Sequence, residues 1–158
     1  MSSVGNTPAV AQTTALGRLF EPVGAIAGLM ARFSLAVIFF KSGLTKWSGF
    51  MELSPSAVYL FENEFKVTFL GTAYGFPYPD IMAHVAGTAE IVLPILLVIG
   101  LFTRFAALGL FAMTVVIFLV YPTHWPNEQL PWAAMALSLV AYGAGKISLD
   151  YLFARKTG

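Results

Sequence analysis

The sequence contains no cysteine. This excludes disulfides, thiol catalysis, iron–sulfur ligation and cysteine-type zinc sites. Charge is also scarce, because charged residues make up 11% of the chain, against about 25% in soluble domains. The net charge is +1, so the chain lacks the basic field that nucleic-acid binding requires. The sequence also lacks a glycine-rich phosphate loop, a nucleophile elbow and a paired-histidine zinc motif.

What the chain has in abundance is apolar surface. Hydrophobic residues make up 58% of its 158 residues, and the mean hydropathy is +0.76. A soluble domain of this length could not bury so much apolar surface in one core. The length predicts one domain, and the composition predicts an integral membrane protein.

Four apolar segments approach the roughly 20 residues that a membrane helix needs. They run from about Val23 to Gly43, Ile81 to Phe102, Phe105 to Tyr121 and Leu130 to Gly145. The fourth is short, and a start nearer Pro126 would lengthen it. We therefore predict an all-α fold, a four-transmembrane-helix bundle over residues 23–158. Residues 1–22 lack the basic start and apolar run of a signal peptide, and we expect them to form a flexible or surface-lying tail.

The longest connection, from about Lys46 to Asp80, contains a second kind of helix. The pair Ser54-Pro55 is a helix start signal. Apolar residues then gather on one face, namely Ala57, Val58, Leu60, Phe61 and Phe65. This pattern predicts an amphipathic helix on the membrane surface. The stretch "YGFPYPD" (Tyr74 to Asp80) carries two prolines and predicts an extended turn back into the membrane.

The basic residues of the short loops predict the orientation. One side holds Arg18, Arg104, Lys146, Arg155 and Lys156. The other side holds Lys46 and Lys66, with Lys41 near its border. Both termini are therefore expected in the cytoplasm, and the long first loop is expected outside.

Two charged residues lie inside apolar segments, Arg32 in the first and Glu90 in the second. Charges at this depth cost about 2.5–3.5 kcal/mol on insertion scales and usually have partners. One interpretation is an Arg32–Glu90 ion pair that sets the helix register. The other is that both residues line a cavity for a quinone headgroup, a proton or an ion. Lys46 shares the helix face of Arg32 and completes a predicted polar centre.

Gly43 and Pro94 bear on the same region. Gly43 lies on the Arg32 face of the first helix, where it permits close helix contact. Pro94 has no N–H and cannot bond the carbonyl four residues earlier, which belongs to Glu90. The backbone oxygen and the carboxylate of Glu90 therefore both need donors.

The two histidines, His84 and His124, are expected on the same outer side of the membrane. Histidine is a common ligand, so a two-histidine haem or copper site is one interpretation. The other is a pair of interfacial histidines, because no further ligand motif accompanies them. At the opposite side, "GAGKISLD" (Gly143 to Asp150) is expected to end the fourth helix, and Ser148 or Asp150 is expected to cap a short terminal helix.

Four stretches occur in a familiar order. They are "ARFSLAVIFFKSGLTKW" (Ala31 to Trp47), "AE" (Ala89-Glu90), "GLFTR" (Gly100 to Arg104) and "GAGKISLD". This order resembles that of the DoxX family of small four-helix membrane proteins, over nearly the whole chain after about Gly24. The resemblance marks as characteristic Arg32, Gly43, Lys46, Glu90, Arg104, Gly145 and Asp150. One departure is Ala144, where the family usually has proline between two glycines.

The resemblance implies a prokaryotic inner-membrane protein. The family name is tied to membrane subunits associated with thiosulfate oxidation and quinone reduction, and other members are linked to oxidative-stress complexes. Further members accompany the biosynthesis of small copper-binding peptides. The segments "FFKSGLTKW", "FENEFKV" and "YPTHWP" are most similar to that group.

We therefore expect an integral membrane accessory subunit of a quinone-linked redox complex or of a metal-handling complex. The alternatives are a non-catalytic scaffold for a partner complex and a membrane protein that conducts protons or copper. The sequence identifies no cofactor; a quinone is one candidate, and haem or copper fits less well. Expected partners are membrane lipids and either membrane or periplasmic subunits or further copies of the chain. No residue is assigned a catalytic role, and the chain is not expected to be catalytic by itself.

Overall fold

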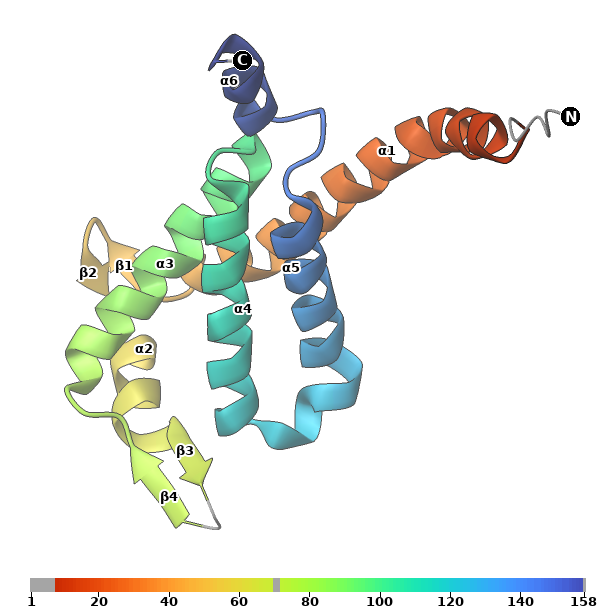
Figure 1. Ribbon diagram of the computed structural model, residues 1–158. Helices are drawn as coiled ribbons and strands as arrows, with labels where there is room; N and C mark the ends of the chain where they lie inside the picture. Colours follow the sequence, from red (N-terminus) through yellow and green to blue (C-terminus); the bar gives the residue numbers. More distant parts are fainter. Residues whose placement is uncertain (1–7, 70–71, 158) are drawn as a thin grey trace, which may run out of the picture.

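The computed structural model describes residues 8–69 and 72–157, and it is mostly helical (Figure 1). The α-helices are α1 (Pro8–Leu44), α2 (Pro55–Tyr59), α3 (Pro79–Ile99), α4 (Thr103–Val120), α5 (Leu130–Tyr142) and α6 (Leu149–Thr157). Shorter helical turns are η1 (Leu60–Glu64), η2 (Pro122–His124) and η3 (Trp125–Gln129). Two antiparallel hairpins join β1 (Trp47–Gly49) to β2 (Glu52–Leu53) and β3 (Lys66–Phe69) to β4 (Thr72–Gly75).

Within the described residues, three helices are long and apolar enough to cross a membrane: Pro22–Leu44, Pro79–Ile99 and Thr103–Val120. They match the first three expected spans. The fourth expected span differs, because α5 has 13 residues and a membrane helix needs about 20. The π-helical turn η3 leads directly into α5, so the helical segment starts near Pro126. The structure confirms a mostly helical fold with three candidate spans.

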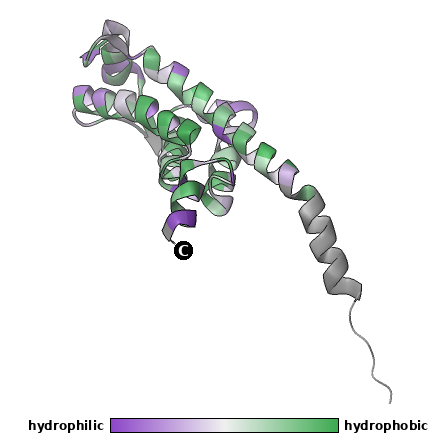
Figure 2. Cartoon of the chain, turned by 90° about the horizontal axis from the view of Figure 1, so that it is seen from above, coloured by the Kyte–Doolittle hydropathy of each residue, from purple (hydrophilic) through white to green (hydrophobic). Residues whose placement is uncertain are grey.

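The four longest helices pack in a cycle: α1 against α3, α3 against α4, α4 against α5, and α5 against α1. At one end of the helices, α3 connects to α4 and α6 packs nearby; we call this the α6 end. We call the opposite end the β3–β4 end (Figure 1). Hydrophobic residues occupy most of the long helices, whereas the C-terminal turn is hydrophilic (Figure 2). This distribution suits a protein whose helices are surrounded by lipid.

The start of the chain is helical where the structure describes it. Residues 8–22 are helical and continue into the first candidate span as a single helix, α1, with Pro22 inside it. Residues 1–7 of the expected tail lie outside the described residues. The expectation of a flexible or surface-lying tail over residues 1–22 stays a prediction.

The long connection between α1 and α3 contains the expected helix and two hairpins that were not expected. The helix start at Ser54 is confirmed, because its side chain accepts a hydrogen bond from the Ala57 N–H at 3.2 Å. Ala57 and Phe61 are buried, and Glu62 is exposed, so the helix is amphipathic as predicted. The strands have two to four residues each, too few to produce a clear alternating pattern.

The tight connections at the α6 end follow from backbone conformation. Gly100 ends α3 with a positive φ of 70°, the left-handed conformation that glycine adopts readily after a helix. Gly143 and Gly145 have φ values of 77° and 73° and separate α5 from α6. The predicted glycine stop after α5 is confirmed.

Gly43 sets where α1 crosses α3. A Cβ atom at this position would lie 3.0 Å from the carbonyl carbon of Glu90 and 2.9 Å from Cδ1 of Ile91. Real Cβ atoms rarely come so close to backbone, so only glycine fits without a shift of the helices. The expected close helix contact is confirmed.

We predict that Gly43→Ala lowers the stability of the protein by about 1–3 kcal/mol, the range for overpacking a tight contact. Gly28→Ala is the matched control, because it lies on the same helix and nothing is within 4 Å of its Cβ position. The control is expected to be neutral or stabilising by about 0.5–1 kcal/mol. Thermal unfolding in detergent measures both, and equal melting temperatures for the two variants would contradict the close contact.

Candidate functional site

The helical domain is packed solid at one end and hollow at the other. The buried hydrophobic core comprises Leu35, Ala36, Phe39, Leu97, Ala106, Ala107, Leu110, Ala136 and Leu139. On α3, α4 and α5 these residues come from the half of each helix nearer the α6 end. The other half of the domain contains a half-open cavity of about 470 Å³. The candidate site is this cavity, at the β3–β4 end.

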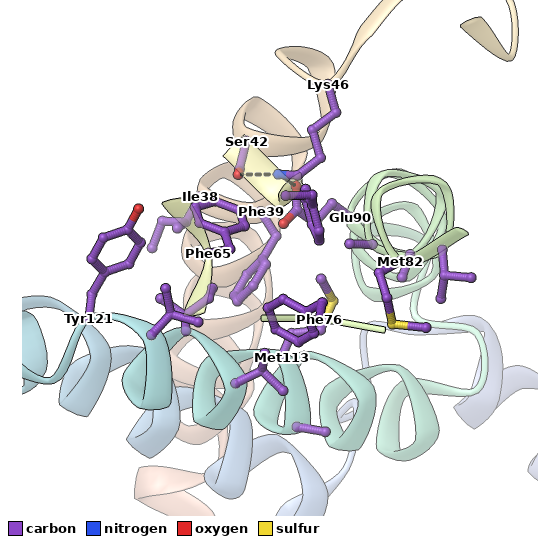
Figure 3. A pocket seen from close by; sticks show the side chains of 18 of the residues that line it. Ile38, Phe39, Ser42, Lys46, Phe65, Phe76, Met82, Glu90, Met113 and Tyr121 are labelled. Atoms are coloured by element: carbon purple, nitrogen blue, oxygen red, sulfur yellow. Dashed lines mark hydrogen bonds and ion pairs between the residues drawn. The ribbon is translucent and has the colours of Figure 1, made fainter. Parts of the chain in front are cut away.

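The cavity wall is mainly aromatic and aliphatic (Figure 3). Its aromatic residues are Phe39, Phe61, Phe65, Phe76, Tyr121 and Trp132. Two methionines, Met82 and Met113, add adaptable apolar surface. Ser42, Lys46 and Glu90 supply polar side chains. A mostly apolar pocket with a few convergent polar groups is the usual form of a small-molecule site.

The polar part of the cavity is an ion pair between α3 and the turn that follows α1. Nζ of Lys46 lies 2.6 Å from Oε2 of Glu90, and it donates a second hydrogen bond to Oγ of Ser42 at 3.3 Å. The side chains of Lys46 and Glu90 are 12% and 5% exposed. Water therefore screens this pair weakly, and the short distance is that of a charge-assisted hydrogen bond.

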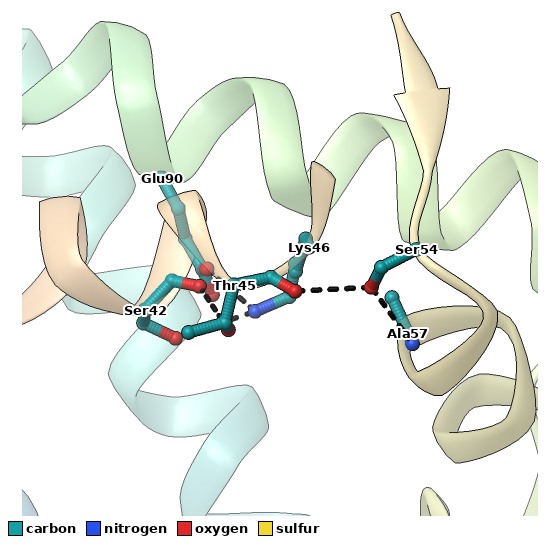
Figure 4. A network of polar contacts seen from close by, with 6 residues as sticks. All are labelled: Ser42, Thr45, Lys46, Ser54, Ala57 and Glu90. Carbon is teal, nitrogen blue, oxygen red and sulfur yellow. Dashed lines mark hydrogen bonds and ion pairs between the residues drawn. The ribbon is translucent and has the colours of Figure 1, made fainter. Parts of the chain in front are cut away.

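The loop after α1 holds Lys46 in place (Figure 4). The Ser54 N–H donates to the Lys46 carbonyl at 2.8 Å, and the Ser54 hydroxyl donates to the Thr45 carbonyl at 3.0 Å. The same hydroxyl caps α2 through the Ala57 N–H. The start of α2 and the end of α1 are thus tied to each other beside the ion pair.

The expected pairing of Arg32 with Glu90 was wrong. Arg32 is 2% exposed and donates to four backbone carbonyls, those of Leu97, Val98, Ala144 and Ile147, at 2.6–3.1 Å. The reason is the crossing point of α1 and α3. Gly43 lies against Glu90, which brings Lys46 within reach, whereas Arg32 lies about 16 Å along the helix toward the α6 end.

At the α6 end, Asp150 has a partner that we did not expect. Its carboxylate accepts from the backbone N–H groups of Phe102 and Thr103 at 2.8 and 2.9 Å, so it caps the start of α4. Ser148 performs the predicted cap of α6 by accepting from the Tyr151 N–H at 3.2 Å. The "GLFTR" and "GAGKISLD" stretches therefore meet in space and stabilise each other.

Arg104, Gly145 and Pro94 have separate positions. Arg104 is exposed and donates to the Ala141 carbonyl at 3.4 Å, close to Gly143. Gly145 supplies a positive φ in the α5–α6 loop. Pro94 is buried inside α3, and the turn it leaves without a hydrogen bond lies where Gly43 packs against Glu90. None of the three lines the cavity, and Arg104 and Gly145 lie at the α6 end, away from it.

Tyr121 is a fourth polar residue of the cavity wall. Its ring contacts those of Phe65 and His124, with centroids 5.8 and 5.9 Å apart. Partial burial, and to a smaller extent the nearby Glu64 carboxylate, raise the pKa of Tyr121. The hydroxyl therefore stays protonated at neutral pH and remains a hydrogen-bond donor. In Figure 3 this ring lies apart from the Lys46–Glu90 pair.

The two histidines have different surroundings. Nδ1 of His84 lies 2.8 Å from the Asp80 carbonyl, and its ring packs against Trp47. The ring of His124 packs against Tyr121. Within residues 8–69 and 72–157, no group of three histidine, aspartate or glutamate side chains is placed to hold a metal ion.

Sequence reasoning named Lys46 and Glu90 but missed most of the wall around them. Phe61 and Phe65 are four residues apart, about one helical turn, and this spacing did identify the apolar face of the surface helix. Nothing in the sequence indicated that this face closes over a cavity together with Phe76 and Tyr121, because these residues come from separate segments.

Comparison with known proteins adds a family. A family model described as DoxX matches residues 27–123. An uncharacterized protein of Haemophilus influenzae (strain ATCC 51907 / DSM 11121 / KW20 / Rd) is 34% identical over 143 residues, which cover 78% of this chain and 81% of that protein. No solved structure matches the chain.

We predict that Lys46→Met and Glu90→Gln each destabilise the protein, because each leaves a buried polar partner alone. The loss on breaking a buried pair is about 3–5 kcal/mol. The double variant is expected to lose less than the sum of the two single losses, since the pair is then absent as a unit. Arg32→Leu combined with Glu90→Gln is the control and should be additive. Unfolding free energies measure both cycles, and additivity at Lys46 and Glu90 would contradict their pairing.

We also predict that Arg32→Leu is far more damaging than Arg104→Leu. Hydrogen bonds to charged groups contribute about 1.5–3 kcal/mol each, and Arg32 makes four of them. Arg104 is exposed, and surface substitutions usually change stability by less than about 0.5 kcal/mol. Yield of folded protein and melting temperature in detergent compare the two variants. Similar losses would show that the Arg32 contacts do not hold the α6 end together.

Proposed function

Because this chain belongs to the DoxX family of membrane proteins, we propose that it is an accessory membrane subunit of a quinone-linked redox complex. Its part in that complex is to hold a quinone in the cavity at the β3–β4 end. The observation that carries the proposal is the buried Lys46–Glu90 pair in the wall of an otherwise apolar cavity. A charge pair of this kind has no role in lipid contact and marks a functional candidate.

The size and lining of the cavity support a ring-shaped ligand. A volume of about 470 Å³ lies within the usual range of roughly 300–1,000 Å³ for ligand pockets. Aromatic side chains favour offset or edge-to-face contacts with another ring, worth about 0.5–1.5 kcal/mol per pair beyond simple burial. The ammonium group of Lys46 is a donor for a ring oxygen.

The arrangement in the membrane is part of the same proposal. The α6 end carries Arg104, Lys146, Arg155 and Lys156, and basic residues favour the cytoplasmic side. We place both termini in the cytoplasm of a prokaryotic cell, the cavity toward the outer face of the inner membrane, and α5 with η3 as a fourth crossing. Partner subunits or further copies of the chain would complete the complex.

The alternative functions have less support. A path for protons or copper ions would have to cross the α6 end, where the core and the Arg32 contacts fill the space between the helices. A metal-handling role would need ligands, and His84 and His124 have separate surroundings. A scaffold function does not require a polar pair in a cavity.

The proposal predicts that quinone co-purifies with the protein in native membrane particles. Ala86→Phe places a ring inside the cavity, which Ala86 lines, and should reduce the extracted quinone several-fold. Ala134→Phe is the matched control, because Ala134 is an exposed residue of α5 and does not line the cavity. Solvent extraction and chromatography measure the quinone per protein. Equal amounts in both variants, or none with the unaltered protein, would contradict the proposal.

A further inference from the structure

We infer that the cavity selects a ring that carries a phenolic hydroxyl over the same ring with a carbonyl or an ether oxygen. For a quinone this means preference for the reduced, hydroxylated form. The inference rests on the proposed role of the cavity as a ligand site. It concerns the two hydrogen-bonding groups that the ion pair leaves open toward the cavity.

The first open group is a donor. A lysine ammonium has three N–H bonds. One donates to Glu90 at 2.6 Å and one to Ser42 at 3.3 Å, so the third remains for a ligand. Lys46 lines the cavity and is 12% exposed. An oxygen atom of a ligand near the pair can accept this hydrogen bond.

The second open group is an acceptor beside it. The Lys46 contact uses Oε2 of Glu90, and no residue of the described part of the chain donates to Oε1. Among the described residues, the fully buried side-chain nitrogen and oxygen atoms without a hydrogen-bond partner are Oγ1 of Thr103 and Oε1 of Gln129. Oε1 of Glu90 is not one of them, so this atom is accessible. Glu90 lines the cavity, so Oε1 can accept a hydrogen bond from a ligand there.

A hydroxyl group fits this arrangement and a carbonyl does not. A hydroxyl donates one hydrogen bond and also accepts, whereas a carbonyl or ether oxygen only accepts. A phenol can therefore donate to Oε1 of Glu90 while it accepts from Lys46. A carbonyl at the same place would occupy Lys46 but leave a carboxylate oxygen without a donor in an apolar cavity, which is costly.

The apolar wall explains why the hydroxyl should be on a ring. Phe39 and Phe76 both line the cavity. Phe39 already makes an edge-to-face contact with Trp132, with centroids 5.9 Å apart. A further ring can join this cluster by contacts of the same type, and an aliphatic alcohol cannot.

The test compares two redox-inert probes, a 4-alkylphenol and its methyl ether, with the purified full-length protein in the same detergent. The probes differ only in the hydrogen atom that would bond Glu90. Because a hydrogen bond to a charged group contributes about 1.5–3 kcal/mol, the phenol should bind about 10- to 100-fold more tightly than the ether. Calorimetric titration gives both dissociation constants. Equal affinity, or no binding of either probe, would overturn the inference.

Two variants check that the preference comes from Glu90. Glu90→Gln places an amide at the carboxylate, which can donate as well as accept, so the phenol and the ether should bind with similar affinity. Glu62→Gln removes an exposed carboxylate of η1 and should keep the full preference. A preference that persists in Glu90→Gln would assign it to another group. The comparison in the unaltered protein decides the inference even when Glu90→Gln does not fold.

A quinone and its quinol separate this inference from the proposed function. Tighter binding of the quinol supports both. Equal binding of quinone and quinol, with no difference between phenol and ether, overturns the inference and leaves the quinone role intact. Discrimination between phenol and ether without binding of quinone or quinol overturns the quinone role and keeps the phenol preference.

Discussion

The contact that the rest of the structure depends on is the one between the Arg32 guanidinium and four backbone carbonyls. Two of these carbonyls belong to the last turn of α3, where few intrahelical donors remain, and two belong to the α5–α6 loop. In an apolar medium each carbonyl without a partner is costly, and a guanidinium supplies several donors at once. Arg32 thus joins α1, α3 and the end of α5, and Asp150 adds the start of α4.

With one end closed in this way, the other end can remain hollow. Near Arg32, leucine and alanine side chains fill the space between the helices. At the other end, the aromatic side chains that line the cavity leave part of this space unfilled. The Lys46–Glu90 pair lies in that wall. A buried ion pair adds little stability compared with apolar residues of the same size, and this is one reason why we propose a ligand for the cavity.

Particular residues show how far sequence reasoning reached. Hydropathy identified three spans, and glycine and serine signals located the end of α5 and the start of α6. Of the three residues predicted to form the polar centre, Lys46 and Glu90 meet, whereas Arg32 lies at the α6 end. Helical periodicity placed Arg32 and Lys46 on one face of α1, but it did not say which of them would lie opposite Glu90. The short strands and the aromatic wall had no usable signal, because their residues come together from separate segments.

The sequence by itself determined that this is a membrane protein, which helices can span the membrane, where the chain reverses and which polar residues need partners. These properties follow from local composition and spacing, which the sequence records directly. Only the tertiary structure decided the partners. The absence of a side chain at Gly43 sets the crossing point of α1 and α3. This crossing point places Lys46 beside Glu90 and Arg32 beside the ends of α3 and α5. A crossing point depends on contacts between distant segments, so no local pattern contains it.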